Sequence, residues 1–136
     1  MKSFNGLFLL SLSLLTMACG KAPNSVINPS AHPSLQGSWQ LTTLKCGSNL
    51  IPTSDLWVFN FSGGQLTRIR NGFQLDSRAY TQTGYQINLG AQGLSSPYTL
   101  NYHWEGSSLA IEENIFSTLC QSRGYQGAST GLFSRI

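Results

Sequence analysis

Residues 56–70, LWVFNFSGGQLTRIR, decide the fold that the rest of the chain can adopt. Side chains alternate between the two faces of an extended strand, so Trp57, Phe59 and Phe61 share one face. Aromatic residues of this kind favour strands. Two glycines then separate this run from a second one, which is the signature of a tight hairpin turn. The stretch therefore predicts two antiparallel strands, the first of which buries an aromatic face.

The same alternation recurs on both sides of this hairpin. We expect further strands over residues 35–43, 73–82, 85–89, 98–104, 109–112 and 131–136. Turn signals such as Asn71-Gly72 and Gly106-Ser107 separate them. About eight strands joined by short turns predict an all-β fold, a small up-and-down antiparallel barrel, because closure removes the exposed edges of a long meander.

Residues 113–121 fit two patterns. Phe116, Leu119 and Cys120 would share one face of a short helix, whereas Phe116, Thr118 and Cys120 would share one face of a strand. We expect a strand or irregular chain here, and no long helix anywhere.

The beginning of the chain predicts export. Lys2 precedes an apolar run that ends near Leu15. This run is too short to span a bilayer, which requires about 20 apolar residues, and it has the parts of a secretory signal. Small Ala18 stands directly before Cys19. An ordinary secreted protein, cleaved near Ala18 or Ala22, is one outcome of such a leader.

Residues 15–20, LTMACG, resemble the lipobox of bacterial lipoproteins. The resemblance implies that residues 1–18 are a signal peptide and that Cys19 carries diacylglycerol, with further acyl chains such as palmitate. Two or more chains give stable membrane attachment. No Asp follows Cys19, which in this family implies the outer membrane of a Gram-negative bacterium. Residues 19–34 contain three prolines and predict a disordered tether that spans about 20 Å.

Composition limits the remainder to one small domain, residues 35–136. The full chain has 136 residues, of which 10% are charged, and its net charge is +3. The basic residues are dispersed, so nothing indicates a nucleic-acid partner.

Lipid on Cys19 would leave Cys46 and Cys120 as an even pair. An exported protein favours a disulfide between them. The alternatives are two free thiols, or a bond from one of them to Cys19. Neither cysteine has a second Cys or His at ligand spacing, so we expect no metal site and no cofactor.

Residues 35–41, LQGSWQL, resemble the opening strand of lipocalin-like domains with its Gly-x-Trp signature. Residues 57–64, 85–87 and 132–135 extend the resemblance over most of the domain. It implies that Arg135 packs over Trp39 at the closed end of the barrel, a cation–π contact of about 0.5–2 kcal/mol. The Thr-Asp-Tyr turn of classical lipocalins is missing, which leaves ligand carriage open. The META-type domain also opens with Gly-x-Trp, but its Gly-Cys-Asn segment is absent.

Aromatic residues on the expected strands form the main candidate binding site. They would line a cavity for a small apolar ligand, or fill a dry core, since a barrel of about eight strands does either. These candidate ligand-lining residues are Trp57, Phe59, Phe61, Tyr98, Tyr102 and Trp104.

Catalytic patterns are weak. Residues 127–131, GASTG, match a nucleophile elbow around Ser129, but the required histidine does not follow it. His103 and Glu105 point the same way on one strand, which fits a surface pair better than an acid–base site. Glu112 and Glu113 point to opposite faces. We expect no enzyme.

Three arginines form the last candidate surface. Arg68 and Arg70 share a face, and Arg78 is expected across the hairpin. They would contact an acidic partner or lipid headgroups, or simply form a solvated outer face, which we favour. The sequence thus predicts a non-catalytic envelope lipoprotein, membrane-bound through Cys19. It would bind a small apolar ligand in the barrel or, alternatively, an envelope protein through its surface loops.

Overall fold

The computed structural model describes residues 33–136. The predicted signal peptide (1–18), Cys19 and residues 19–32 of the tether lie outside the described residues. The described part contains no helix that is long and apolar enough to span a bilayer.

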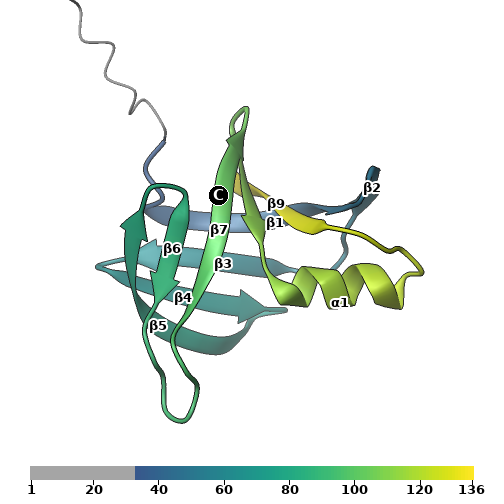
Figure 1. The fold of residues 1–136 in the computed structure, drawn as a ribbon. Helices are drawn as coiled ribbons and strands as arrows, with labels where there is room; N and C mark the ends of the chain where they lie inside the picture. Colours follow the sequence, from purple (N-terminus) through teal and green to yellow (C-terminus); the bar gives the residue numbers. More distant parts are fainter. Residues whose placement is uncertain (1–32) are drawn as a thin grey trace, which may run out of the picture. The chain divides into compact units, whose positions relative to one another are not determined.

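Nine strands and one helix make up residues 33–136 (Figure 1). In chain order they are β1 (Gly37–Cys46), β2 (Asn49–Pro52), β3 (Trp57–Ser62), β4 (Gln65–Arg70), β5 (Phe73–Thr83), β6 (Gln86–Leu89), β7 (Tyr98–Glu105), β8 (Ser108–Glu112), α1 (Asn114–Ser122) and β9 (Ser129–Arg135).

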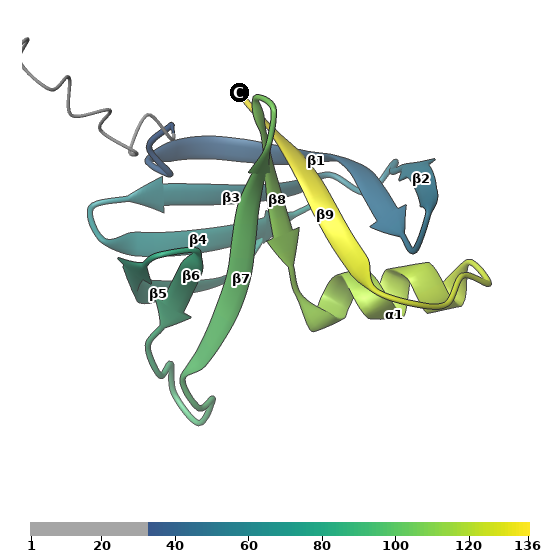
Figure 2. The ribbon, with the colours of Figure 1, turned by 45° about the horizontal axis from the view of Figure 1, so that its top comes forward.

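Eight of these strands form a closed antiparallel barrel, which confirms the predicted all-β architecture. From β3 to β9, each strand pairs with the next one in the chain, and β1 pairs with both β3 and β9. Figure 2 shows β9 between β8 and β1, where the barrel closes. Strand β2 is an addition to the barrel that pairs only with the end of β1. Its four residues were not predicted as a strand.

The hairpin of β3 and β4 is the one that residues 56–70 predict. Its register runs from Trp57 opposite Arg70 to Ser62 opposite Gln65. Gly63 and Gly64 have φ values of 57° and 75°, so the turn is of the type that requires positive φ at both central positions. Turn chemistry and alternation therefore agree with the observed register of this hairpin.

The closed end of the barrel holds a tryptophan and an arginine. Trp39 Nε1 donates a hydrogen bond of 2.8 Å to the Leu35 carbonyl. The Arg135 guanidinium lies over the Trp39 ring, 5.6 Å from its centroid, and donates a 2.7 Å bond to the Gln36 carbonyl. Strands β1 and β9 place these residues directly opposite each other. The first and last strands are thus tied together at this end.

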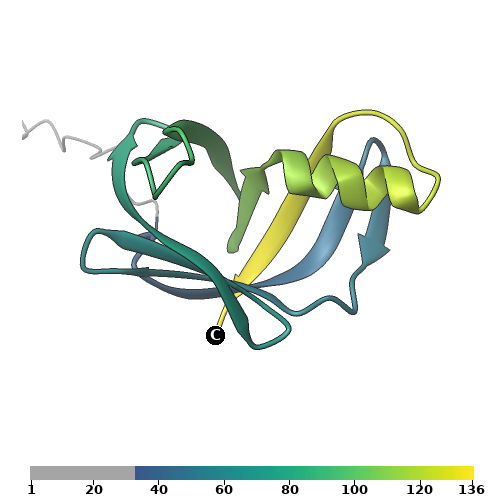
Figure 3. The ribbon, with the colours of Figure 1, turned by 90° about the horizontal axis from the view of Figure 1, so that it is seen from below.

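Residues 114–122 are helical, so the prediction of a strand or irregular chain there was wrong. Phe116 and Cys120, which are four residues apart, are the buried residues of α1 and face the barrel. A disulfide joins Cys120 to Cys46 at the end of β1, which confirms that predicted pair. Helix α1 packs against β9 and β1, as Figure 3 shows from below. Residues 114–122 form a helix because it buries Phe116 and Cys120 on one helical face, whereas a strand would have placed Thr118 on the buried face with them.

A glycine in β9 permits this close packing of α1. A Cβ at Gly131 would lie 2.8 Å from the Phe116 ring and 2.9 Å from Leu41. The Phe116 ring also contacts Phe133 and Trp57, at centroid distances of 5.9 and 6.4 Å. Any side chain at residue 131 would therefore require the Phe116 ring and the Leu41 side chain to shift.

We expect Gly131→Ala to lower the free energy of unfolding by about 1–3 kcal/mol, the usual cost of overpacking a core. Urea denaturation followed by tryptophan fluorescence measures this change. Gly90→Ala is the matched control, since a Cβ there would meet its nearest neighbour at an ordinary 3.5 Å. Equal effects of the two substitutions would contradict the packing argument.

Loss of the disulfide should destabilise the barrel end that α1 covers. The bond links residues 74 positions apart, and the chain-entropy model gives about 4 kcal/mol for a loop of this length. The double variant Cys46→Ala, Cys120→Ala should approach this loss in urea denaturation, and its α1 amides should exchange hydrogen fastest. Unchanged exchange in α1 would show that the disulfide does not hold the helix.

Candidate functional site

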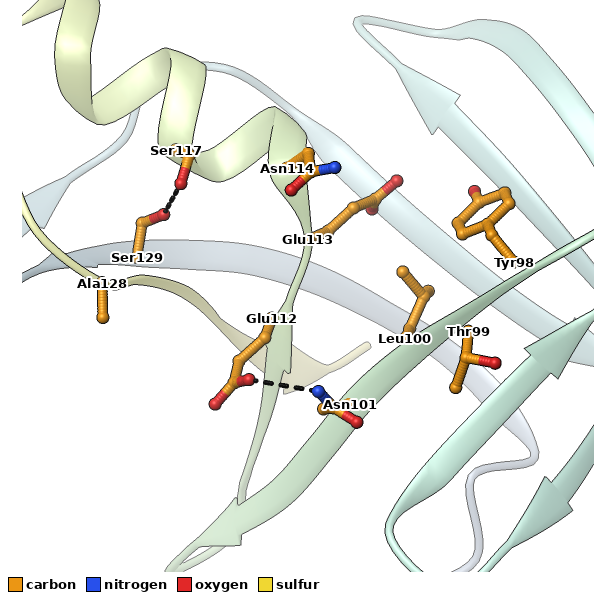
Figure 4. Close-up of a pocket in the computed structure, with 10 residues that line it drawn as sticks. All are labelled: Tyr98, Thr99, Leu100, Asn101, Glu112, Glu113, Asn114, Ser117, Ala128 and Ser129. Carbon is orange, nitrogen blue, oxygen red and sulfur yellow. Dashed lines mark hydrogen bonds between the residues drawn. The ribbon is translucent and has the colours of Figure 1, made fainter.

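A pocket of about 620 Å³ lies where β8 ends and α1 begins. We call it the mouth pocket, because it is at the barrel end opposite Trp39 and Arg135. Figure 4 shows its walls: the first residues of β7, the junction of β8 and α1, and the start of β9. Its lining residues are Tyr98, Thr99, Leu100, Asn101, Glu112, Glu113, Asn114, Ser117, Ala128 and Ser129.

Strand lengths create this pocket. Pairing of β7 with β8 begins only at Asn101, which lies opposite Glu112. Residues 98–100 of β7 therefore extend beyond β8, because the chain leaves the sheet there to form α1. The Asn101 amide donates to the Glu112 carboxylate at 3.5 Å, and the Ser117 and Ser129 hydroxyls are 2.7 Å apart (Figure 4). Polar side chains thus line a gap that the sheet leaves open.

Four charged side chains gather beside the mouth pocket. This charged cluster consists of Arg68, Asp76, Arg78 and Glu113, whose side chains are 7–14% exposed. Arg68 binds Asp76 through two nitrogens and Glu113 through a third. Arg78 Nε donates a 3.2 Å bond to the same Asp76 carboxylate. The cluster pairs two cations with two carboxylates inside an otherwise apolar barrel.

A β-bulge brings Asp76 into this cluster. The register between β4 and β5 shifts between Arg68, which lies opposite Asp76, and Ile69, which lies opposite Gln74. One extra residue, Leu75, is accommodated there and is exposed. Without the bulge, Leu75 rather than Asp76 would lie opposite Arg68, and the guanidinium would be buried without its bidentate partner.

Arg78 and Tyr98 connect the cluster to the loop that precedes β7. Arg78 Nη1 donates to the carbonyls of Gly90 and Ser96, at 3.1 and 3.4 Å. The guanidinium carbons of Arg78 and Arg68 lie 5.1 and 5.7 Å from the centre of the Tyr98 ring. Burial, together with the nearby Glu113, raises the pKa of Tyr98 to about 12. Tyr98 is therefore a neutral wall of the pocket.

The two carboxylates of the cluster differ in their environments. Burial raises the pKa of Asp76, but hydrogen bonds and charge from Arg68 and Arg78 outweigh it, and the pKa lies below its ordinary value. Burial also raises the pKa of Glu113, and Arg68 offsets it only in part, so that pKa lies above its ordinary value. Glu113 Oε2 is buried and has no hydrogen-bond partner. Glu113 is the incompletely satisfied member of the cluster.

The prediction that the three arginines form a solvated outer face was wrong for Arg68 and Arg78. Arg68 and Arg78 point inward, because Arg68 lies on the same face of β4 as buried Leu66, and Arg78 lies opposite Leu66 on β5. Arg70 lies farther out, over the Trp57 ring at 5.2 Å and 3.3 Å from Asp55. The buried Leu66 two residues before Arg68 was the available signal for an inward face.

The predicted ligand-lining aromatics pack largely against other rings. Phe59 contacts Phe133 at 4.7 Å between centroids, and Trp104 contacts Trp39 at 5.5 Å. Trp57, Phe59, Phe61 and Tyr102 are at most 4% exposed, and Tyr98 and Trp104 are partly buried against the core. Of these six residues, Tyr98 alone also lines the mouth pocket.

Ser129 does not lie in a nucleophile elbow. It begins β9, not a helix, and its hydroxyl bonds with Ser117. His103 Nε2 lies 3.0 Å from Glu105, which also accepts a 3.0 Å bond from Lys45, in a surface cluster. Within residues 33–136, no three His, Cys, Asp or Glu side chains are grouped to hold a metal ion.

Comparisons with known proteins give no match: no protein-family model, no curated protein and no solved structure is similar to the chain.

The two carboxylates should have opposite effects on stability. Asp76→Asn should lower the free energy of unfolding at pH 7 by about 3 kcal/mol, because two buried guanidinium groups lose their shared anion. Since the native pKa of Asp76 is depressed, its contribution is complete above 3.8 and is lost as the pH falls through the native value. The variant should therefore lose less stability on acidification than the parent.

Glu113→Gln should leave stability at pH 7 unchanged or higher. Because the native pKa of Glu113 is raised, its ionisation costs stability as the pH rises from 4.5 through the native value. Any gain from the substitution should disappear below pH 4.5. Urea denaturation of both variants between pH 3 and 8 measures these changes, and a larger loss at Glu113 than at Asp76 would contradict this assignment.

Proposed function

We propose that the chain is a non-catalytic, lipid-anchored protein of the bacterial cell envelope that binds a small ligand in the mouth pocket. The observation that carries this proposal is the pocket itself: about 620 Å³, bordered by the buried Glu113 carboxylate with one oxygen unpartnered. Ligand sites are concave, of this size, and place a few polar groups in fixed positions. The leader and Cys19 support export and anchoring.

This proposal places the ligand outside the aromatic interior of the barrel. An apolar ligand among Trp57, Phe59 and Phe61 would have to displace rings that already contact other core residues, such as Phe133, Phe116 and Tyr80. Close packing makes such displacement costly. The mouth pocket requires no comparable displacement, since it is open beside the end of β8.

A second candidate is a protein-binding module. Five large exposed hydrophobic residues lie on β2, on β5 and in loops at the same end of the barrel as α1, and a contiguous apolar patch there would mark a protein-binding surface. They are Leu50, Leu56, Phe73, Leu75 and Leu94. Such a surface would bind an envelope protein rather than a small molecule.

Native mass spectrometry of the full protein, purified in mild detergent from its own membrane, tests both candidates. We expect a mass that lacks residues 1–18, carries lipid, and releases a small molecule when the protein unfolds. The Cys19→Ser control should lack the lipid mass. A mature protein with an unmodified Cys19 thiol would contradict the anchor. An empty pocket, or a co-purified protein in place of a small molecule, would contradict the small-ligand proposal, and the latter would support the module.

A further inference from the structure

An unpartnered oxygen beside the mouth pocket identifies the chemistry of its ligand. Glu113 Oε1 pairs with Arg68, whereas Oε2 has no hydrogen-bond partner and is buried. The side chain as a whole is 9% exposed. A buried carboxylate oxygen without a donor is unfavourable, and most such atoms in proteins have a partner. Among the described residues, the Tyr98 hydroxyl also stabilises the Glu113 carboxylate, but Oε2 itself has no hydrogen bond, so a donor in the mouth pocket would add one.

Figure 4 shows how a donor would approach. The Glu113 carboxylate points into the space between the start of α1 and Tyr98, with Leu100 and Asn114 beside it. The terminal torsion of a glutamate side chain is broad, so rotation of the carboxylate can turn Oε2 toward the pocket. Access therefore requires movement of one carboxylate group and no change of the backbone.

The lining favours a cation over an anion. Both charged residues among the ten that line the pocket are acids, Glu112 and Glu113, and none is basic. The nearby Arg68 and Arg78 are already bound to carboxylates and to loop carbonyls. Arg68 already compensates the charge of Glu113, so Glu112 supplies the uncompensated negative charge of the lining. It exceeds the partial positive charge of about half a unit at the first turn of α1.

The polar lining also favours an organic cation over a metal ion. Among the described residues, no group of three potential metal ligands exists. Instead, amides and hydroxyls surround the two acids, namely those of Thr99, Asn101, Asn114, Ser117 and Ser129. These groups suit the hydroxyls or amides of an organic molecule, and the volume of the pocket suits a small one.

We propose that the mouth pocket binds a small organic molecule through a primary ammonium group, which donates a hydrogen bond to Glu113 Oε2. Charge-assisted bonds of this type are the stronger ones in proteins. Glu112 adds a second negative charge at the rim. This inference rests on the proposed function, since it names the class of ligand for the same pocket. The ammonium group could belong to a free polyamine, an amino sugar or a lysine side chain.

Isothermal titration calorimetry of the full, detergent-solubilised protein at pH 7.5 tests whether the ligand carries an ammonium group. The probes are putrescine, glucosamine and Nα-acetyl-lysine amide, which stand for the three sources. Butane-1,4-diol, glucose and Nα-acetyl-6-hydroxynorleucine amide are their respective neutral counterparts, since hydroxyls replace the ammonium groups in the same frameworks. We expect at least one ammonium probe to bind, and to bind at least tenfold more tightly than its neutral counterpart.

Substitutions locate the contact. Glu113→Gln keeps the size of the side chain and should lower the affinity for the ammonium probe at least tenfold. Glu112→Gln should lower this affinity less. Glu105→Gln is the matched control, because Glu105 lies outside the pocket, where it pairs with Lys45 and His103, and affinity should not change. Urea denaturation of Glu113→Gln verifies that the variant is folded, as the raised pKa of the parent residue leads us to expect.

Other outcomes overturn the inference in distinguishable ways. Equal binding of ammonium and neutral probes would reject the ammonium class and leave the small-ligand function standing. Binding that Glu113→Gln and Glu105→Gln weaken equally would reject Glu113 as the contact. No binding by any probe would reject the inference, whereas a small molecule released in native mass spectrometry would still support the proposed function.

Discussion

The barrel exists as a closed sheet because β1 pairs with β9. This pairing closes the barrel along residues 39–46, and it places Trp39 opposite Arg135 at one end. Closure also requires the chain to travel from the end of β8 to the start of β9 over residues 113–128. Helix α1 occupies this connection, and the disulfide to Cys46 holds the helix against the end of β1. The mouth pocket exists because the chain leaves the sheet at the end of β8, before the level at which β7 begins.

The charged cluster places four ionised side chains in the interior of a small barrel. The charged cluster is neutral in formal charge, with two guanidinium groups and two carboxylates, and Asp76 is bound by both arginines. Buried pairs are weak contributors to stability but are costly to break. They also accompany a defined register, since the bulge at Leu75 places Asp76 opposite Arg68. Glu113 gains least from the arrangement, and groups whose pKa values are perturbed by burial cluster at functional sites.

The sequence predicted the parts of the fold that alternation and turn chemistry determine. Each of the eight barrel strands has an expected strand in the sequence, and the Gly-Gly pair at 63–64 and the Asn-Gly pair at 71–72 form the turns from β3 to β4 and from β4 to β5. The helix was missed because nine residues satisfy both periods, and only packing of Phe116 and Cys120 chooses between them. Strand β2 is too short to carry a pattern. The charged cluster was missed because a bulge at Leu75 alters which side chain faces Arg68, and a linear pattern does not contain that information.

A filled interior and a binding site at the mouth are compatible because they use different parts of the barrel. The rings of Phe59, Phe116 and Phe133 provide the buried area on which stability depends, so ligand exchange at the mouth need not disturb them. The described chain begins near Trp39, at the closed end, while Glu113 lies at the opposite end of the antiparallel strands. A ligand at the mouth would therefore leave both the packed rings and the contact between Arg135 and Trp39 intact.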